Sequence, residues 1–394
     1  MKHPKGFKFS GVACGIKPSL SLDLAVVSTN RSSVVAGVYT QNVVRAASID
    51  WNRGLTPSGE FRAVVINSGN ANACTGQQGV NDNQRMAEMV AEQLGASPNQ
   101  VLVLSTGVIG HFLPMEKIGP GLISAVSSQS DSAEDFESVS TAILTTDKKS
   151  KTVHRTIHFD ENPVHISGMA KGAGMIGPNM ATMLAVIMTD AKIGEVNAQK
   201  LLVDAAEQSF NRISVEGHTS TNDALLLICS GESGVEISSE AESAKFAATL
   251  NSSCIELAKQ IPSDGEGASH LVTIVVRGAQ SDEDADLVAR TVAASALVKT
   301  AITGADPNWG RIVSAAGYSG VEMDVEHTDL NLNGHTVFRN GRPAKFDADV
   351  VSQSMSSQFE TLVELKIGNG SGYATHWTSD LTVEYVRFNS EYTT

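Results

Sequence analysis

One threonine, Thr182, stands between a glycine-rich turn and an apolar run in the segment MAKGAGMIGPNMATMLAVIM (169–188). A threonine hydroxyl is a poor nucleophile unless a base accepts its proton. A threonine at the start of a chain carries its own base, because an unperturbed α-amine has a pKa of about 7.7 to 8.0. Thr182 could gain such an amine if its hydroxyl attacked the carbonyl of Ala181 and water hydrolysed the resulting ester.

The residues around Thr182 suit this self-cleavage. Ala181 is small, and Pro178 together with the glycines of KGAGMIG defines a tight turn. The run MLAVIM that follows can anchor the new terminus as a buried strand. The alternative is that Thr182 only begins a strand, a position where threonine is common.

Three stretches rich in glycine and small polar residues could supply hydrogen-bond donors for the reaction. They are NSGNANACTG (67–76), STGVIG (105–110) and ADPNWGR (305–311). Any one of them alone is most often a loop in which glycine serves the backbone geometry. Stretches of this composition after buried strands bring backbone N–H groups close to a ligand, so the set favours an oxyanion or carboxylate site.

Other motifs for catalysis or binding are weak. The lysine of KGAGMIG precedes the glycines, and no GxxxxGK[ST] or GxSxG occurs. GAGMIG matches GxGxxG, but the run before it is too polar for a dinucleotide-fold strand. His154 and His158 would suit zinc on a helix, whereas TVHRTIHF alternates like a strand and would hold the rings about 13 Å apart. We therefore expect surface histidines.

The elements that must position these residues alternate between short strands and helices. FRAVVIN (61–67) and VLVLS (101–105) predict buried strands, and the segment between them predicts a helix capped by Gly95. Further predictions are helices at 198–210 and 241–259, strands at 270–276 and 381–388, a hairpin at Asn333-Gly334 and a turn at Asn340-Gly341. This pattern is typical of a mixed α/β protein with large sheets, although it leaves the strand order open.

The composition is that of an ordinary globular protein. The chain has 394 residues, of which 41% are hydrophobic and 18% charged, enough for one large domain or two to three smaller ones. A net charge of -14 from scattered acids disfavours nucleic acid and anionic membranes as partners. No apolar run has the length of a signal peptide or a membrane helix. The four cysteines lie far apart without a CxxC pair, so a cytoplasmic protein with a small-molecule partner is expected.

The motifs taken together resemble the ornithine acetyltransferase (glutamate N-acetyltransferase) family of arginine biosynthesis. The likeness runs from about Gly6 to Thr394 and is carried by NSGNANACTG, STGVIG, KGAGMIGPNMATML, TSTNDALLL, DGEGA, ADPNWGR and a C-terminal NSEYTT. It implies that a precursor cuts itself between Ala181 and Thr182. The products, an α chain (1–181) and a β chain (182–394), would remain associated.

The resemblance also implies a fold and a reaction. The fold would be an α/β layered sandwich of sheets flanked by helices, like the self-cleaving aminopeptidases of the same superfamily. Residues at about 182–280 would complete the sandwich, and about 281–394 would form a smaller C-terminal α/β lobe. Acetyl would pass by a ping-pong mechanism from N-acetylornithine to Thr182 and then to glutamate. The usual assembly is two α and two β chains, no metal or bound cofactor is indicated, and acetyl-CoA is a further candidate donor.

Site residues follow from the same resemblance. Thr182 would be the nucleophile and its freed amine the base, with Thr106 and Gly107 as the oxyanion-hole pair. Lys171 would lie near the nucleophile and the substrate, and Glu266 would meet a substrate ammonium. The remaining substrate-binding candidates are either Thr145 or Thr146 of TTD and, closing over the substrate from the tail, Asn389 and Thr394.

Two positions depart from the family pattern. Gly177 stands where alanine is frequent, which would loosen the turn slightly, and His270 stands where a lysine is often found. The second change replaces a fixed charge near Glu266 by a ring that can be neutral. Two other functions stay open: an N-terminal-threonine amidase or aminopeptidase, in which water takes the acyl group, and a non-catalytic amino-acid-binding protein whose precursor stays whole.

Overall fold

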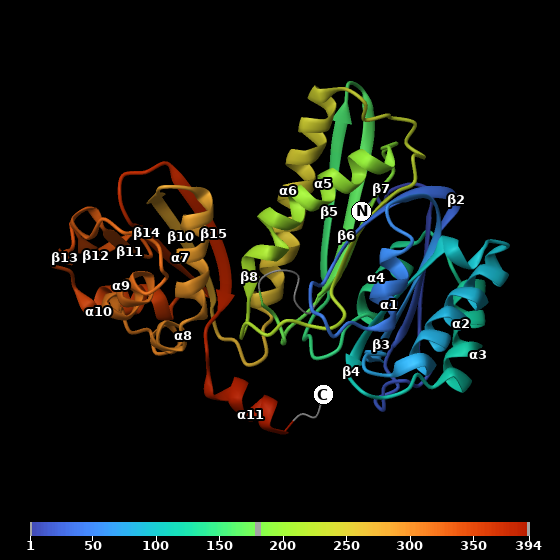
Figure 1. Cartoon of the computed structure of the whole chain (residues 1–394), viewed down its shortest axis with the longest axis horizontal. Coiled ribbons are helices and arrows are strands. Elements are labelled where there is room, and N and C mark those ends of the chain that lie inside the picture. The colour runs from blue at the N-terminus through green and yellow to red at the C-terminus, as the bar shows by residue number, and fades with distance from the viewer. Residues whose placement is uncertain (1, 178–182, 392–394) are drawn as a thin grey trace. The chain divides into compact units, whose positions relative to one another are not determined.

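The computed structural model describes residues 2–177 and 183–391 of the chain. These residues divide into two compact units, one built from residues up to 211 and from 218–261, the other from 212–217 and from 262 onward. Each unit has its own β-sheet with helices packed against it (Figure 1). The expected α/β class, with layered sheets and helices and a smaller C-terminal α/β part, is confirmed. Within the described ranges, no helix has the length and apolar character needed to cross a membrane.

The sheet of the first unit has the strand order β4-β3-β2-β9-β7-β6-β5, and β1 pairs with β2. The pairs β3–β4 and β7–β9 are parallel, and the other neighbours are antiparallel. The predicted strands at 61–67 and 101–105 are confirmed as β3 and β4. The bounds are β1 Phe7–Val12, β2 Leu24–Tyr39, β3 Ser58–Asn70, β4 Val101–Val108, β5 Lys151–Phe159, β6 Asn162–Lys171, β7 Leu184–Thr189 and β9 Ala224–Cys229.

Helices bury both faces of this sheet. α2 and α3 lie side by side (Figure 1), and their apolar residues form one core with β2, β3 and β4. A second core joins α4 to the other side chains of the same strands. α2 ends where predicted, because Gly95 follows it in the left-handed conformation with φ 61°. The bounds are α1 Ala47–Arg53, α2 Gly76–Leu94, α3 Met115–Ser127, α4 Ala133–Ala142, α5 Glu195–Gln208 and α6 Glu240–Ser263.

The sheet of the second unit has the order β13-β12-β11-β14-β10-β15-β8. The expected hairpin joins β11 to β12, with φ 46° at Asn333 and 80° at Gly334, and the expected turn follows at Asn340-Gly341. The predicted strand at 270–276 is confirmed as β10. The bounds are β8 Ile213–Ser214, β10 Leu271–Ala279, β11 Asp329–Leu332, β12 His335–Arg339, β13 Arg342–Pro343, β14 Glu360–Lys366 and β15 Gly372–Ser379.

Four helices supply the apolar core on one face of this second sheet: α7, α8, α9 and α10. A fifth helix, α11, follows β15 and has no buried residue. The bounds are α7 Asp282–Ala294, α8 Ala296–Thr303, α9 Trp309–Gly317, α10 Ala348–Ser356 and α11 Val383–Glu391.

Two predictions from local pattern are wrong. The stretch 381–388 is not a strand, because α11 begins at Val383 and the hydroxyl of Thr382 accepts a hydrogen bond from the backbone N–H of Tyr385, which caps it. Of the two histidines expected at the surface, His158 is exposed as predicted, but His154 is not. Its ring is half-buried, 5.1 Å from the Phe136 ring and 5.0 Å from the His3 ring.

Candidate active site

The segment that contains Thr182 joins two neighbouring strands of the first sheet. β6 ends at Lys171, β7 begins at Leu184, and these two residues are paired across the antiparallel ladder. Leu184 also pairs with Ala224, the first residue of β9. The predicted cleavage residues Ala181 and Thr182 lie outside the described residues, as does Thr394. The site is therefore built from the residues that flank this segment.

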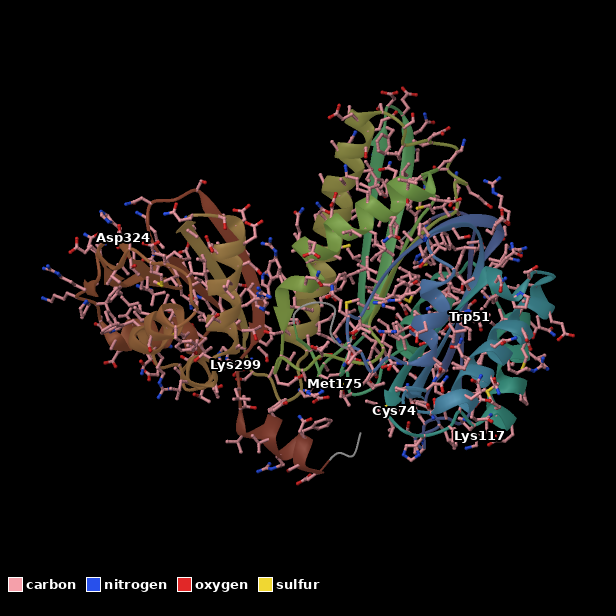
Figure 2. The ribbon with its side chains drawn as sticks, in the orientation of Figure 1. Trp51, Cys74, Lys117, Met175, Lys299 and Asp324 are labelled. Carbon is pink, nitrogen blue, oxygen red and sulfur yellow. The ribbon has the colours of Figure 1, made fainter. Side chains whose placement is uncertain are left out.

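The turn after β6 is held in an unusual backbone conformation. Gly172 has φ 150°, which few other residues adopt. Met175, labelled in Figure 2, has φ 58° although it is not glycine, and such a conformation costs on the order of 1 kcal/mol or more. Ala173 and Ile176 are buried, so packing fixes the turn. This is the constrained geometry expected before a self-cleaving bond.

Lys171 and Thr106 meet in the interior of the first unit. The Lys171 Nζ donates a hydrogen bond of 3.3 Å to the Thr106 Oγ1, and both residues are buried. Because the Thr106 oxygen accepts from an ammonium group, its own O–H proton can be donated elsewhere. The Lys171 ammonium at the end of β6 and the Thr106 hydroxyl at the end of β4 could together stabilise an oxyanion.

Gly107, the second predicted oxyanion residue, allows β3 and β4 to approach each other closely. It has φ 132° and pairs with Gly69, which has φ 99°, at a point where the register of the ladder shifts. A Cβ added to Gly107 would lie 2.3 Å from the Gly69 carbonyl carbon. Only glycine fits here, and the irregular pairing is of the kind that turns backbone groups away from the ladder.

Asp147 organises the turn and the TTD segment, a role that the sequence analysis missed. One carboxylate oxygen, Oδ1, accepts from the Gly172 N–H at 2.6 Å and from the Lys151 Nζ at 2.7 Å. The other accepts from the Thr145 N–H at 3.1 Å. The side chains of Asp147 and Lys151 are fully buried. Thr145 and Thr146 are half-buried beside them, so the structure places both candidates at the start of the glycine turn.

The charges around Asp147 are strongly coupled. Burial by itself would raise the pKa of this carboxyl, but the Lys171 and Lys151 ammonium groups and the Gly172 N–H outweigh it and hold the pKa at about 2. Asp147 is therefore ionised at any working pH. It fixes the two lysines and the turn in one arrangement.

A second buried acid, Asp223, holds the residue that follows Thr182. Its Oδ1 accepts a hydrogen bond of 2.8 Å from the Met183 N–H. Its other oxygen has no hydrogen-bond partner within the described part of the chain. Burial raises the pKa of Asp223 well above its usual value, although the Met183 N–H and the Lys171 charge oppose this. Asp223, a buried acid whose raised pKa favours the protonated form, is a group that sequence reasoning passed over in TSTNDALLL.

The asparagines near these residues mostly fix the loops. The Asn222 Nδ2 donates to the backbone oxygens of Ala71 (2.7 Å) and Ser105 (2.8 Å), which ties the start of β9 to the end of β4. In NSGNANACTG, the Asn72 Nδ2 donates to the Gly79 carbonyl. In the same stretch, the Asn70 Nδ2 donates to the Phe112 carbonyl at 3.0 Å, so both side chains hold neighbouring loops in place. In ADPNWGR, the Asn308 side chain caps α9.

Glu266 and Asn389, both predicted to bind substrate, meet in the second unit. The Asn389 Nδ2, on α11, donates a hydrogen bond of 3.0 Å to the Glu266 Oε2. Asn389 is exposed and Glu266 is half-buried in the loop before β10. The same loop is held to α11 by the Thr382 hydroxyl, which donates to the Gly267 carbonyl at 2.7 Å. The structure therefore brings the tail helix to the carboxylate.

Asp380 secures this loop from the other side. Its fully buried carboxylate accepts from the backbone N–H groups of Ser269 at 2.9 Å and His270 at 3.1 Å. The His270 Nδ1 lies 3.3 Å from the second oxygen of Asp380. His270, which stands where the family often has a lysine, is thus paired with Asp380.

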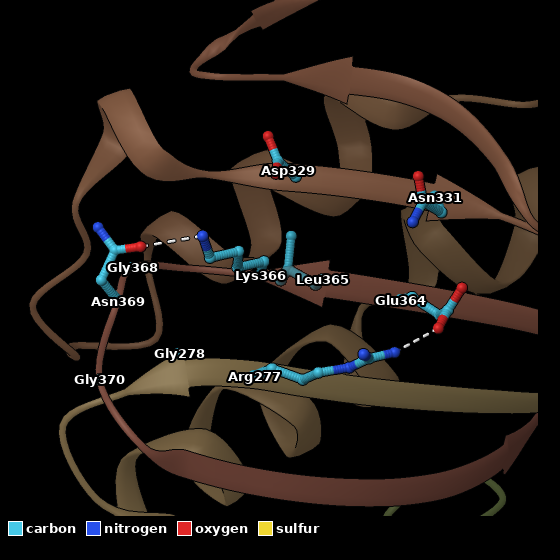
Figure 3. A pocket seen from close by; sticks show the side chains of 10 residues that line it. All are labelled: Arg277, Gly278, Asp329, Asn331, Glu364, Leu365, Lys366, Gly368, Asn369 and Gly370. Carbon is cyan, nitrogen blue, oxygen red and sulfur yellow. Dashed lines mark hydrogen bonds and ion pairs between the residues drawn. The ribbon is translucent and has the colours of Figure 1, made fainter.

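A cavity on the second sheet contains none of the predicted residues (Figure 3). Its basic side chains are engaged, Arg277 with Glu364 and Lys366 with Asn369. Among the described residues, no group of three or more His, Cys, Asp or Glu is arranged to hold a metal ion.

The chain is similar over its whole length to known proteins. A model of the ArgJ family matches residues 8–394. The arginine biosynthesis bifunctional protein ArgJ of Rhodopirellula baltica is 49% identical over 99% of this chain and 96% of its own length. The protein of the same name from Geobacter sulfurreducens is 43% identical over 99% of both. The crystal structure of arginine biosynthesis bifunctional protein argJ from Bacillus halodurans has a TM-score of 0.51 and 37% identity, covering 52% of this chain and 98% of that one.

Proposed function

This chain belongs to the ArgJ family, and on that premise we propose that it transfers acetyl from N2-acetylornithine to glutamate through an acetyl-threonine at Thr182. The observation that supports this best is the hydrogen bond from Lys171, the last residue of β6, to Thr106 of the expected oxyanion pair, because β6 leads directly into the segment that contains Thr182. The relatives from Rhodopirellula baltica and Geobacter sulfurreducens are named bifunctional, so we extend the proposal to acetyl-CoA as a second acetyl donor.

The first proposed step is self-cleavage. The Thr182 hydroxyl attacks the Ala181 carbonyl carbon, the Ala181–Thr182 C–N bond breaks, and the ester that forms is hydrolysed by water. The products are a carboxylate on Ala181 and a free α-amine on Thr182. Asp223 would hold the Met183 N–H while this happens, and the strained turn before the bond favours its opening.

The second step is acetyl transfer. The Thr182 amine accepts the hydroxyl proton as the oxygen attacks the acetyl carbonyl. The oxyanion accepts hydrogen bonds from the Gly107 N–H and the Thr106 hydroxyl, and the nearby Lys171 charge stabilises it further. Ornithine leaves with a proton, and the amine of glutamate then attacks the acetyl ester and restores the enzyme. Glu266 would receive the side-chain ammonium of ornithine, with Thr145 or Thr146, Asn389 and Thr394 completing the contacts.

We further propose that the two cleavage products stay together, as two α and two β chains in the cytoplasm. β6, from the first product, pairs with β7, from the second, from Ile166↔Thr189 to Lys171↔Leu184. β2 pairs with β9 in the same way. Denaturing electrophoresis of active protein should therefore show two fragments in place of one chain of 41.5 kDa, and both should co-elute in native gel filtration.

Ornithine release from N-acetylornithine, measured with and without glutamate, tests the reaction. Sustained release is expected only with glutamate, because the acetyl-enzyme otherwise accumulates after one turnover. Equal release without glutamate would instead identify an amidase, in which water takes the acetyl group. A single uncut chain that binds amino acids without turnover would identify the non-catalytic alternative.

A further inference from the structure

A lysine outside all the predicted site residues lies beside the oxyanion pair. Lys17 belongs to the loop between β1 and β2, and its side chain packs over Gly69. A methyl group added to Gly69 would lie 3.1 Å from the Lys17 Cγ. Gly69 is the partner of Gly107 in the ladder. Lys17 therefore packs against the strand residue that pairs with Gly107, whose N–H is the proposed oxyanion donor.

The loop that carries Lys17 is built around a buried acid. The carboxylate of Asp23, which is fully buried, accepts backbone N–H groups from four consecutive residues, Cys14 to Lys17, at 2.6 to 3.0 Å. The Lys117 Nζ, labelled in Figure 2, donates to the Gly15 carbonyl at 2.9 Å. These five hydrogen bonds hold the backbone of the loop in place, and with it the position of the Lys17 side chain.

The ammonium of Lys17 is half-buried and makes few polar contacts. Its Nζ donates to one acceptor, the Leu22 carbonyl at 2.7 Å, and no carboxylate of the described chain forms an ion pair with it. Burial lowers the pKa of Lys17, and the Lys171 charge adds to this while Asp23 and Asp147 oppose it. The acids nearby are already engaged, Asp23 by the four N–H groups and Asp147 by Lys151 and Gly172.

Both proposed substrates carry a carboxylate, which could serve as the ion-pair partner of the Lys17 ammonium. N-acetylornithine and glutamate both have an α-carboxylate. In an N-acetyl amino acid, only the amide nitrogen and the α-carbon separate the carboxylate from the acetyl carbonyl. A carbonyl held at Thr106 and Gly107 therefore keeps its carboxylate close by. The Lys17 ammonium has three N–H donors, of which one is used by the Leu22 carbonyl, so it can also donate to such a carboxylate.

We propose that Lys17 binds the α-carboxylate of the amino-acid substrate in both halves of the reaction. This inference rests on the proposed function. It adds a residue that selects substrates with a free α-carboxylate over peptides and amides, because a neutral carboxamide at that position would leave the half-buried ammonium without a counter-charge.

Lys17→Met tests the inference, since methionine keeps the length of the apolar stem. We expect kcat/KM to fall about tenfold to a hundredfold for N-acetylornithine and for glutamate alike, as for a lost hydrogen bond between charged groups. Self-cleavage uses no substrate carboxylate and should proceed as in the wild type. Lys17→Arg should recover part of the loss, and Lys8→Met, at an exposed lysine of β1, should have no effect.

The amide analogue N2-acetylornithinamide gives the decisive comparison. The wild type should prefer the carboxylate substrate strongly over the amide, and Lys17→Met should lose most of that preference. The inference is overturned if the preference is unchanged, if only the glutamate half-reaction suffers, or if Lys17→Met also fails to cleave itself. A wild type that cleaves itself but transfers no acetyl between these substrates would instead overturn the proposed function.

Discussion

The two groups of candidate residues differ in how tightly the protein holds them. In the first unit, Lys171, Thr106 and Asp147 are fixed by buried hydrogen bonds and ion pairs that leave little freedom. In the second, Glu266 and Asn389 meet through one hydrogen bond between a half-buried loop and an exposed helix. Bond-making groups gain from a rigid setting, whereas groups that admit and release substrates need freedom. The contrast suggests a division between chemistry and recognition.

The largest effect is expected at position 182. In the proposed mechanism, Thr182 supplies the nucleophile and its cleavage frees the amine, so with Thr182→Ala self-cleavage should stop and acetyl transfer should fall by about 10⁴-fold or more. Mass spectrometry should find one intact chain. Recovery of a fragment that begins at residue 182 from this variant would show that another group cuts the chain.

Replacing Asp147 should destabilise the first unit. Asp147→Asn leaves two buried lysines without their shared anion, which we expect to cost about 3 to 5 kcal/mol of unfolding free energy. The variant is measured in a Thr182→Ala background so that one chain unfolds, and exposed Asp131→Asn is the control.

The pH dependence of stability can be compared between the Asp147→Asn variant and its parent, both in the Thr182→Ala background. The folded pKa of Asp147, about 2, lies below its ordinary value of 3.8. Its stabilisation is therefore fully present above about pH 4 and is lost as the pH falls towards 2. The stability difference between Asp147 and the Asn variant should shrink over that window. A constant difference from pH 6 to pH 2 would mean that the charge does not stabilise the fold.

A smaller but specific effect is expected at Gly107. Gly107→Ala places a Cβ 2.3 Å from the Gly69 backbone, so the strands must separate and the N–H must move. We expect kcat to fall about 10² to 10³-fold, as when an oxyanion donor is removed. Gly194→Ala is the control, because its added Cβ meets nothing within 4 Å. Normal kinetics in Gly107→Ala would remove this residue from the oxyanion site.

The smallest effects belong to the tail. Deleting residues 389–394 should raise KM for the substrates while self-cleavage continues, and Asn389→Ala should raise KM only a few-fold because its hydrogen bond is exposed. Ser390→Ala, one residue further along α11, is the matched control. If the truncated enzyme is as active as the wild type, the second group of residues has no part in recognition.

Local signals predicted much of the fold. The helix that ends at Gly95 and the Asn333-Gly334 hairpin depend on residues close in sequence, and both occur as expected. The stretch 381–388 was wrongly predicted as a strand because the helix that it forms, α11, buries no residue. Its apolar positions therefore follow no helical period, and their chance alternation resembles a strand.

The sequence did not predict Asp147, Asp223 or Lys17 as residues of the site. Asp147 is 25 positions from Gly172 and Asp223 is 40 from Met183 along the chain, yet each pair shares a hydrogen bond. Lys17 is brought to Gly69 by a loop folded around Asp23. These contacts depend on strand order, which the pattern of apolar residues leaves open. Thr106, Gly107 and Lys171 were predicted through the resemblance, whereas composition and spacing supplied only candidate loops.

The pairing of β6 with β7 makes the folding of the uncut chain different from the refolding of the cleaved enzyme. The first sheet is assembled once from a single continuous polypeptide, when its strands are tethered and their encounter is unimolecular. After the proposed scission, the same sheet would contain strands from two separate polypeptides. An unfolded mature enzyme must then find its other half by diffusion, so its recovery from denaturant should depend on protein concentration, whereas that of the uncut precursor should not.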